Sequence, residues 1–154
     1  MPEFLNELLA QQYNEETINK ILSGYKSNRK VTLRVNTLKT NAKNIKNILQ
    51  KSNIEYSEIS WTPNALIIEN ANEKQIEELE IYKNGEIYLQ SLSSMLPPII
   101  MNPQKSEDIL DMCAAPGGKT TQIAAITENQ ANITACEMNA IRAERLKYNI
   151  EKQG

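Results

Sequence analysis

The spacing of apolar residues along the chain indicates a short helical segment followed by two different α/β patterns. Residues 3–12 and 15–23 carry apolar side chains at helical spacing, and Asn14 and Gly24 predict where the second helix begins and ends. Beyond this segment, short stretches alternate apolar and polar residues, a pattern typical of half-buried strands. We therefore predict an amino-terminal helical segment over residues 1–29.

The next part of the chain alternates strand-like and helix-like patterns in the order β-α-β-β-α-β. This order is that of the ferredoxin-like fold, in which two helices cover one face of a small sheet. We therefore predict a ferredoxin-like domain over residues 30–90. The strands are predicted at 31–36, 54–59, 65–69 and 86–90, and the helices at 42–51 and 73–79.

A different pattern covers residues 91–154. It begins with a serine-capped apolar stretch over 91–101, which Pro97 and Pro98 are predicted to interrupt or kink. A β-α-β-α order follows, as at the start of a doubly wound, Rossmann-like parallel sheet. The strands are predicted at 108–113 and 132–137, and the helices at 119–127 and 140–152.

Two strands alone leave the faces and edges of a parallel sheet uncovered. We therefore interpret residues 91–154 as an incomplete, truncated Rossmann-like domain at the front of a longer enzyme. The alternative is a complete small protein that covers the open edge by forming a homodimer. An exposed sheet edge makes such pairing plausible in either case.

Composition excludes several classes of chemistry. The 154 residues include no histidine, which excludes a Ser-His-Asp triad, a histidine general base and a histidine-bearing zinc site. The two cysteines, Cys113 and Cys136, are too few for an all-cysteine zinc site or a disulfide framework, and we predict no metal site. No apolar window is long enough to span a membrane, and the first residues do not resemble a signal peptide. We expect a cytoplasmic protein with reduced thiols and no membrane partner.

The charges are unevenly distributed, although the formal net charge is only −2. Residues 17–54 contain nine basic residues and no acidic one, whereas residues 55–86 contain eight acidic residues and two lysines. One interpretation is that a face of the amino-terminal half attracts a polyanion. The other is that the two blocks neutralise each other in the folded protein. The basic residues are Lys20, Lys26, Arg29, Lys30, Arg34, Lys39, Lys43, Lys46 and Lys51.

The most informative segment is the ten-residue sequence DMCAAPGGKT, which runs from Asp111 to Thr120. A predicted strand enters a turn with two glycines and then the first turn of a helix. Glycines let the backbone adopt positive φ and approach a ligand closely, and the helix start offers unpaired N–H groups. Glu137 follows Gly118 by nineteen residues, at the end of the next strand, where an acid can accept hydrogen bonds from ribose hydroxyls.

Three other interpretations of this segment stay open. A phosphate-binding P-loop would need its first glycine at position 113, where Cys113 stands, although Gly118-Lys119-Thr120 fits its end. A nicotinamide-binding fingerprint would need three spaced glycines, and only the adjacent Gly117 and Gly118 are present. The third is a strand-turn-helix unit that binds no ligand.

The segment closely resembles the cofactor motif of the Nop/Sun family of S-adenosylmethionine-dependent RNA (cytosine-5)-methyltransferases. Other matches follow the family's order: RVNTLK at 34–39, the stretch from Gln90 to Pro98, and Glu137 with Arg142, Leu146 and Asn149. The resemblance implies S-adenosyl-L-methionine as cofactor and ribosomal or transfer RNA as substrate.

The resemblance also implies roles for individual residues. Glu137 would hold the ribose hydroxyls of the cofactor, and Arg142 would assist nearby. Arg34, Asn36 and Lys39 would either contact RNA or brace the cofactor domain. The loop that would hold the methionine part of the cofactor consists of Cys113, Ala114, Ala115, Pro116, Gly117, Gly118 and Lys119.

The family's chemistry requires a thiolate that adds to carbon 6 of cytosine, because carbon 5 is a poor nucleophile. In the family, that cysteine and a second one stand in Thr-Cys-Ser and Pro-Cys motifs on later strands, and neither motif occurs here. Cys113 belongs to the cofactor loop. We therefore predict that the nucleophile lies beyond Gly154 and that this chain alone is inactive. The alternative is a non-catalytic RNA-binding module with a vestigial cofactor loop.

Overall fold

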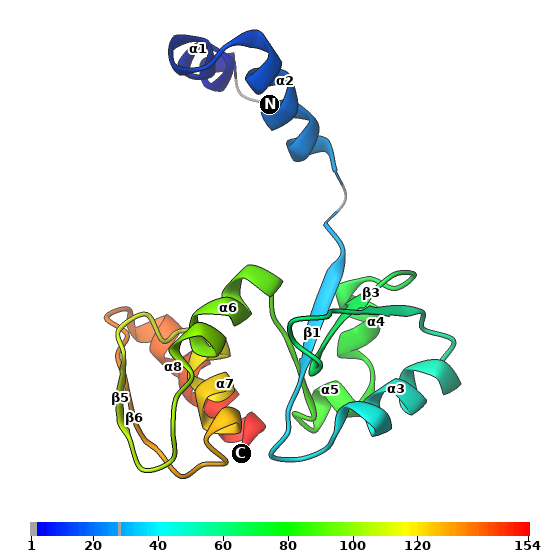
Figure 1. The fold of residues 1–154 in the computed structure, drawn as a ribbon, viewed down its shortest axis with the longest axis vertical. Helices are drawn as coiled ribbons and strands as arrows, with labels where there is room; N and C mark the ends of the chain where they lie inside the picture. Colours follow the sequence, from blue (N-terminus) through cyan, green and yellow to red (C-terminus); the bar gives the residue numbers. More distant parts are fainter. Residues whose placement is uncertain (1–2, 28) are drawn as a thin grey trace.

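The computed structural model describes residues 3–27 and 29–154 (Figure 1). It begins with two helices, α1 (Glu3–Gln12) and α2 (Glu15–Lys26), which stand apart from the rest of the protein. The predicted segment 1–29 also includes residues 1, 2 and 28, which lie outside the described residues. We refer to α1 and α2 together as the arm.

The arm confirms one predicted helix boundary and corrects another. Asn14 caps α2 as predicted, since its side chain accepts a hydrogen bond of 2.9 Å from the Thr17 N–H. The predicted end at Gly24 is wrong, because the helix continues to Lys26. The end is determined instead by Ser27, whose N–H and hydroxyl both donate to the Gly24 carbonyl.

Residues 31–89 form the first module, a four-stranded antiparallel sheet with helices on one face (Figure 1). The strand order β2-β3-β1-β4 is that of the ferredoxin-like fold, which confirms the predicted fold. The predicted helix over 73–79 is shorter, and a second short helix follows it. The elements are β1 (Val31–Val35), α3 (Ala42–Lys51), β2 (Tyr56–Glu58), β3 (Ala65–Ile68), α4 (Glu73–Glu77), α5 (Glu80–Lys83) and β4 (Ile87–Leu89).

The central strand β1 is buried on both faces because its side chains alternate between two environments. Leu33 and Val35 belong to the apolar core that the sheet shares with α3, α4 and α5. Arg34 lies on the opposite face and contacts the rest of the protein across that face. The core residues are Leu33, Val35, Ile45, Leu49, Leu66, Ile68, Ile76, Ile81 and Ile87.

Residues 92–153 form the second module, which begins with α6 (Leu92–Met101). Of the predicted interruption or kink at Pro97 and Pro98, the interruption is wrong, because the helix continues through both prolines. Pro98 cannot donate to the carbonyl of Ser94, as a helix would require. The Gln90 side-chain amide donates to that carbonyl instead, at 3.2 Å.

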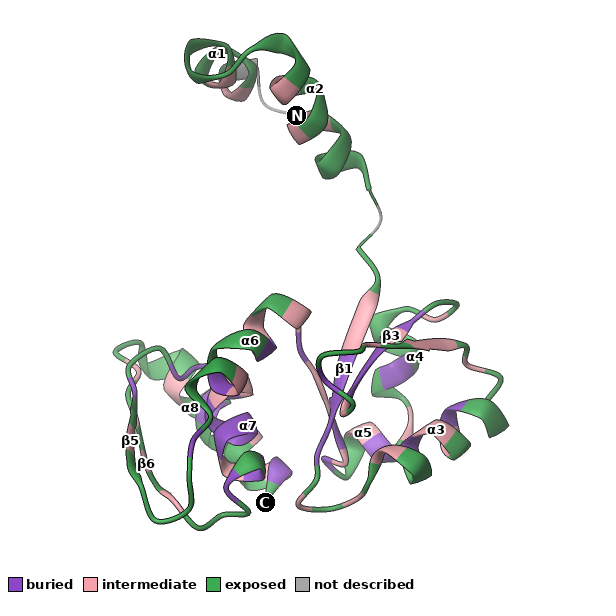
Figure 2. Cartoon of the chain, viewed as in Figure 1, coloured by how far each residue is buried: buried purple, intermediate pink, exposed green. Residues whose placement is uncertain are grey.

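The remaining elements of the second module confirm the predicted β-α-β-α order. They are β5 (Asp108–Asp111), α7 (Gly118–Ile126), β6 (Asn132–Ala135) and α8 (Ala140–Gln153), and β5 and β6 pair in parallel. Both helices lie between this two-stranded sheet and the first module (Figure 1). The strands themselves are largely exposed, as Figure 2 shows by their green colour.

None of the helices in the described part of the chain combines the length and the apolar character that a membrane crossing requires.

Candidate functional site

The loop between β5 and α7 is anchored at its start by Asp111. This buried carboxylate accepts a hydrogen bond from the Cys113 N–H at 3.1 Å and another from the Thr120 hydroxyl at 2.7 Å. The two contacts join the end of the strand to the first turn of the helix. Asp111 and Thr120 are anchoring residues of the candidate site to which the sequence analysis assigned no role. In the sequence they are the first and last residues of the ten-residue motif, and this position could have identified them.

The two glycines of the loop serve packing against the protein itself. Gly117 has φ of 113°, as the motif predicts, and a Cβ atom there would lie 3.3 Å from the Cβ of Asn149. At Gly118 a Cβ atom would lie 3.3 Å from the Tyr88 ring. The expectation of positive φ is confirmed at Gly117. The close approach that the glycines permit is to α8 and β4.

Side chains from α8 and β4 hold the carbonyl groups of the loop. Arg142 donates to the Ala115 carbonyl at 3.0 Å, and Asn149 donates to the Pro116 carbonyl at 2.7 Å. The Tyr88 hydroxyl donates to the same Pro116 carbonyl at 3.3 Å. Burial raises the pKa of Tyr88, so its hydroxyl retains the proton that it donates. The loop is thus held from both modules.

Glu137 has its carboxylate fixed at the carboxyl end of β6. One oxygen accepts from the Asn139 N–H at 2.9 Å, and the other lies 3.1 Å from a guanidinium nitrogen of Arg142. Arg142 therefore links Glu137 to the Ala115 carbonyl of the loop. Parallel α/β sheets bind ligands at this end of their strands.

An open hollow of about 630 Å³ lies beside Glu137. Three residues of the predicted cofactor site line this hollow together: Cys113, Glu137 and Arg142. Cys113 and Cys136 are both free thiols that are exposed. The lining consists of Met112, Cys113, Ala135, Cys136, Glu137, Met138 and Arg142.

The other predicted loop residues lie beneath or beside this hollow. Ala114 and Ala115 are buried against Leu146 of α8. A second hollow of about 170 Å³ lies between the loop and β4, and its lining includes Pro116, Gly118 and Lys119.

Arg34 is buried at the contact between the two modules, with 4% of the residue exposed. Its Nε donates to the Gln90 side chain and its Nη2 to the Thr121 hydroxyl, both at 3.0 Å. The Thr121 hydroxyl in turn donates to the Gly117 carbonyl at 2.7 Å. Burial lowers the pKa of Arg34 to about 10, which leaves the guanidinium charged at neutral pH. Arg34 therefore connects β1 to the cofactor loop.

Asn36 and Lys39 bind the carboxyl end of α8. The buried Asn36 amide donates to the carbonyls of Gly85 and Gln153, at 2.8 and 2.7 Å. The Lys39 ammonium donates to the Lys152 carbonyl at 2.6 Å, where a cation also complements the helix dipole. Of the two roles expected for Arg34, Asn36 and Lys39, this geometry supports bracing of the cofactor domain.

The basic block of residues 17–54 is partly neutralised. Lys30 pairs with Glu69 and Lys46 pairs with Glu58, so two of the lysines bind acids of the following acidic block. Lys20 pairs with Glu16 within the arm. The basic residues that stay exposed and, among residues 3–27 and 29–154, form no ion pair are Lys26, Arg29, Lys39, Lys43 and Lys51, of which Lys39 donates to backbone carbonyls.

Two family models match the chain, one over each part. The model described as "Methyltr_RsmF/B-like, ferredoxin-like domain" matches residues 1–75. The model described as "16S rRNA methyltransferase RsmB/F" matches residues 98–154. Together they cover most of both modules, and residues 76–97 lie outside both matches.

Individual relatives agree with these models. The chain is 40% identical over 123 residues to a tRNA (cytosine(49)-C(5))-methyltransferase of Pyrococcus abyssi, covering 80% of this chain and 39% of that protein. It is 30% identical over 155 residues to ribosomal RNA small subunit methyltransferase F of Shewanella oneidensis, covering 99% of this chain and 33% of that protein. The crystal structure of a methyltransferase homologue from Pyrococcus horikoshii is 26% identical and superimposes with a TM-score of 0.80, covering 99% of this chain and 53% of that one. The chain thus spans about a third to two fifths of the length of these two curated relatives.

Proposed function

The chain belongs to the RsmB/F family of methyltransferases, and on this premise we propose that it serves the S-adenosylmethionine-dependent methylation of carbon 5 of cytosine in ribosomal or transfer RNA. Its second module would supply part of the cofactor site, and its first module would lie on the RNA side. The observation that carries this proposal is the fixed carboxylate of Glu137 at the hollow beyond β5 and β6.

The residues around this hollow fit S-adenosylmethionine. Each Glu137 oxygen makes one contact, which leaves lone pairs that can accept hydrogen bonds from two neighbouring ribose hydroxyls. The exposed thioethers of Met112 and Met138 offer apolar walls for the adenine ring. When bound, the cofactor supplies an electrophilic methyl group.

The protein's own residues would position that group. Cys113 to Lys119 would bind the methionine part, and Arg142 would keep Glu137 and the Ala115 carbonyl at a constant separation. Tyr88 and Asn149 would prevent the Pro116 carbonyl from moving into the site.

We further propose that these 154 residues do not transfer the methyl group by themselves. No Thr-Cys-Ser or Pro-Cys motif occurs among them. Cys113 and Cys136 line the proposed cofactor hollow, so neither is free to attack a cytosine there. Incubation with RNA and methyl-labelled cofactor is expected to leave the RNA unlabelled. Label incorporated above the background of heat-treated protein would contradict this proposal.

Cofactor binding is the first test. Calorimetric titration with S-adenosylhomocysteine is expected to show saturable binding at one site, whereas magnesium-ATP is expected to show none. Binding of ATP alone would overturn the methyltransferase proposal in favour of a P-loop.

A non-catalytic RNA-binding module is the second candidate. Exposed Lys26, Arg29, Lys43 and Lys51 favour it, because they remain available to phosphates. RNA affinity that falls steeply with salt and does not change when S-adenosylhomocysteine is added would support this candidate. A change on adding the cofactor analogue would support the methyltransferase proposal.

The exposed face of the second module supports a proposal about assembly. Leu110, Met112, Met138 and Ile141 are exposed near the open edges of β5 and β6. We propose that this chain self-associates through that region when studied alone. Light scattering is expected to show a mass that increases with concentration, and a constant monomer mass would exclude self-association.

A further inference from the structure

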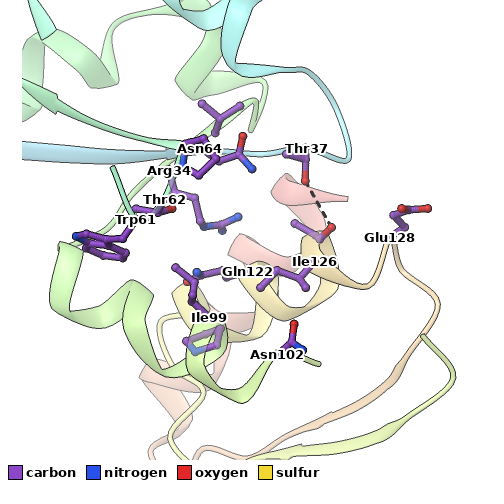
Figure 3. A pocket seen from close by; sticks show the side chains of 14 residues that line it. Arg34, Thr37, Trp61, Thr62, Asn64, Ile99, Asn102, Gln122, Ile126 and Glu128 are labelled. Atoms are coloured by element: carbon purple, nitrogen blue, oxygen red, sulfur yellow. Dashed lines mark hydrogen bonds between the residues drawn. The ribbon is translucent and has the colours of Figure 1, made fainter. Parts of the chain in front are cut away.

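A third hollow, of about 580 Å³, lies between the two modules and takes no part in the proposed cofactor site (Figure 3). It is bounded by the end of β1, the turn at residues 61–64, α6 and the second half of α7. The cofactor loop lies at the opposite, amino-terminal end of α7. Its lining includes Arg34, Val35, Thr37 and Pro98 from the segments that carry the family resemblance, but none of the residues of the proposed cofactor site.

Its walls are suited to a flat ring. Trp61, the only tryptophan of the chain, is 43% exposed and lies at one end (Figure 3). Pro98, Ile99 and Ile126 provide aliphatic surface on the side of α6 and α7. An aromatic side chain beside an aliphatic wall is the arrangement in which proteins stack unpaired bases.

The polar groups of the hollow can recognise the edge of such a ring. Arg34 points into it (Figure 3), and its hydrogen bonds use Nε and Nη2, which leaves Nη1 without a partner among the described residues. The side-chain amides of Asn64 and Asn102 also line the hollow and form no hydrogen bond within 3–27 and 29–154. Amide and guanidinium groups read the donors and acceptors on base edges.

Charge indicates that the ligand is a base and not a free anion. The lining contains one cation, Arg34, and one acid, Glu128, which pairs with Lys105 at 2.6 Å. Because Lys105 neutralises Glu128, Arg34 is, within the described part of the chain, the one unpaired charge of the lining, and with its Nε and Nη2 already bonded to Gln90 and Thr121 it offers only Nη1 to an isolated phosphate. A neutral ring with several hydrogen-bonding groups matches this lining, and the volume is in the range of small-molecule sites.

We propose that this hollow binds one unpaired nucleobase of RNA. The base stacks on Trp61, and its edge contacts Asn64, Asn102 and Nη1 of Arg34. The nature of the ligand rests on the proposed RNA methyltransferase function. Because Arg34 also holds Thr121, and through it the Gly117 carbonyl, the base site is connected to the cofactor loop by direct hydrogen bonds.

The single tryptophan provides the test. Titration of the 154-residue chain with each of the four ribonucleoside 5′-monophosphates is expected to quench Trp61 fluorescence saturably with at least one of them. Inorganic phosphate at the same concentrations is expected to cause no change. Quenching that rises linearly without saturation, or that inorganic phosphate reproduces, would overturn the proposal.

Variants test the assignment of residues. Asn64→Ala is expected to weaken binding by roughly 5- to 20-fold, the range of one or two lost hydrogen bonds. Asn47→Ala, on the exposed side of α3, is the matched control and is expected to leave binding unchanged. Trp61→Ala, measured by calorimetry, is expected to weaken binding by roughly 5- to 100-fold, as loss of a stacking partner does. Equal affinities for all these proteins would refute the proposed site.

Failure of this inference can be distinguished from failure of the proposed function. S-adenosylhomocysteine binding is measured on the same preparations and depends on the other end of α7. A protein that binds the cofactor analogue but no nucleotide retains the proposed function and lacks the base site.

Discussion

The two modules differ in the interactions that organise them. The first has nine buried apolar residues contributed by three strands and three helices. The buried apolar cluster of the second consists of Ala114, Ala115 and Leu146. The loop between β5 and α7 in the second module is held by directional hydrogen bonds, one of which, from the Tyr88 hydroxyl, comes from the first module. The comparison indicates that apolar burial organises the first module, whereas hydrogen bonds fix the loop of the second.

The first prediction concerns the apolar core of the first module and has the largest expected effect on stability. Leu33→Ala is expected to lower the free energy of unfolding by about 2–5 kcal/mol, because Leu33 is fully buried between Leu66 and Leu89. Urea unfolding followed by circular dichroism measures the loss. Leu8→Ala, on the partly exposed surface of α1, is the control and is expected to change stability by less than about 0.5 kcal/mol. Similar losses in both proteins would contradict the assigned core.

The second prediction concerns the bridge between the modules. Arg34→Met retains the apolar stem but removes the bonds to Gln90 and Thr121, and is expected to cost about 1.5–3 kcal/mol of stability. Because Thr121 holds the Gly117 carbonyl, the affinity for S-adenosylhomocysteine is expected to fall as well. Calorimetry under conditions where the variant is folded measures this. Lys43→Met removes an exposed cation and should alter neither quantity. Unchanged affinity in the Arg34 variant would refute a positioning role.

The third prediction distinguishes an effect on cofactor binding from an effect on the stability of the fold. Glu137→Gln removes a charge from the proposed ribose site and is expected to weaken S-adenosylhomocysteine binding by roughly 10- to 100-fold. The melting temperature should change little, since Glu137 bonds only to Asn139 and to the half-exposed Arg142. Glu144→Gln, on the exposed surface of the same module, is the matched control. If both variants bind equally well, Glu137 is not a cofactor ligand.

The smallest expected effect is that of Tyr88, which joins β4 to the loop. Tyr88→Phe is expected to cost about 0.5–1.5 kcal/mol at neutral pH, the value of one hydrogen bond. Burial raises the pKa of Tyr88 above its ordinary value of 10.0, so the folded protein binds this proton more tightly than the unfolded chain. The stabilisation is therefore complete below pH 10 and is lost as pH rises through the raised pKa. Urea unfolding across this range should show the difference between the two proteins shrinking at alkaline pH. A constant difference would contradict this account.

Local patterns predicted the elements of this protein well. The order of strands and helices in both modules, the cap at Asn14 and the positive φ of Gly117 follow from short-range spacing and backbone sterics. The motif, the spacing to Glu137 and the family resemblance also identified Cys113, Glu137 and Arg142 as candidates, and they line one hollow. These features depend on residues that are close together in the chain, or on a recurring strand-turn-helix geometry.

The local spacing of residues did not predict which side chains complete the backbone hydrogen bonds. The helix continues through Pro97 and Pro98, and Gln90, which follows β4, donates to the carbonyl of Ser94 that Pro98 cannot reach with an N–H. The close approach of a ligand to the glycines stays a prediction, and within the protein the nearest neighbours of their missing side chains are Asn149 and Tyr88. Of the two interpretations of the basic block, the pairing of Lys30 and Lys46 with acids of the next segment supports partial neutralisation.

The sequence by itself determined the two α/β patterns, the cofactor-type motif and the absence of histidine chemistry. Only the tertiary structure decided that Arg34 and Asn36 face the second module, that Asp111 anchors the loop and that a hollow opens beside Trp61. The physical reason is the range of the interactions. Backbone sterics and amphipathic spacing act over a few residues, whereas a hydrogen bond such as that between Arg34 and Thr121 forms only after burial of the core has brought together residues 87 positions apart in the sequence.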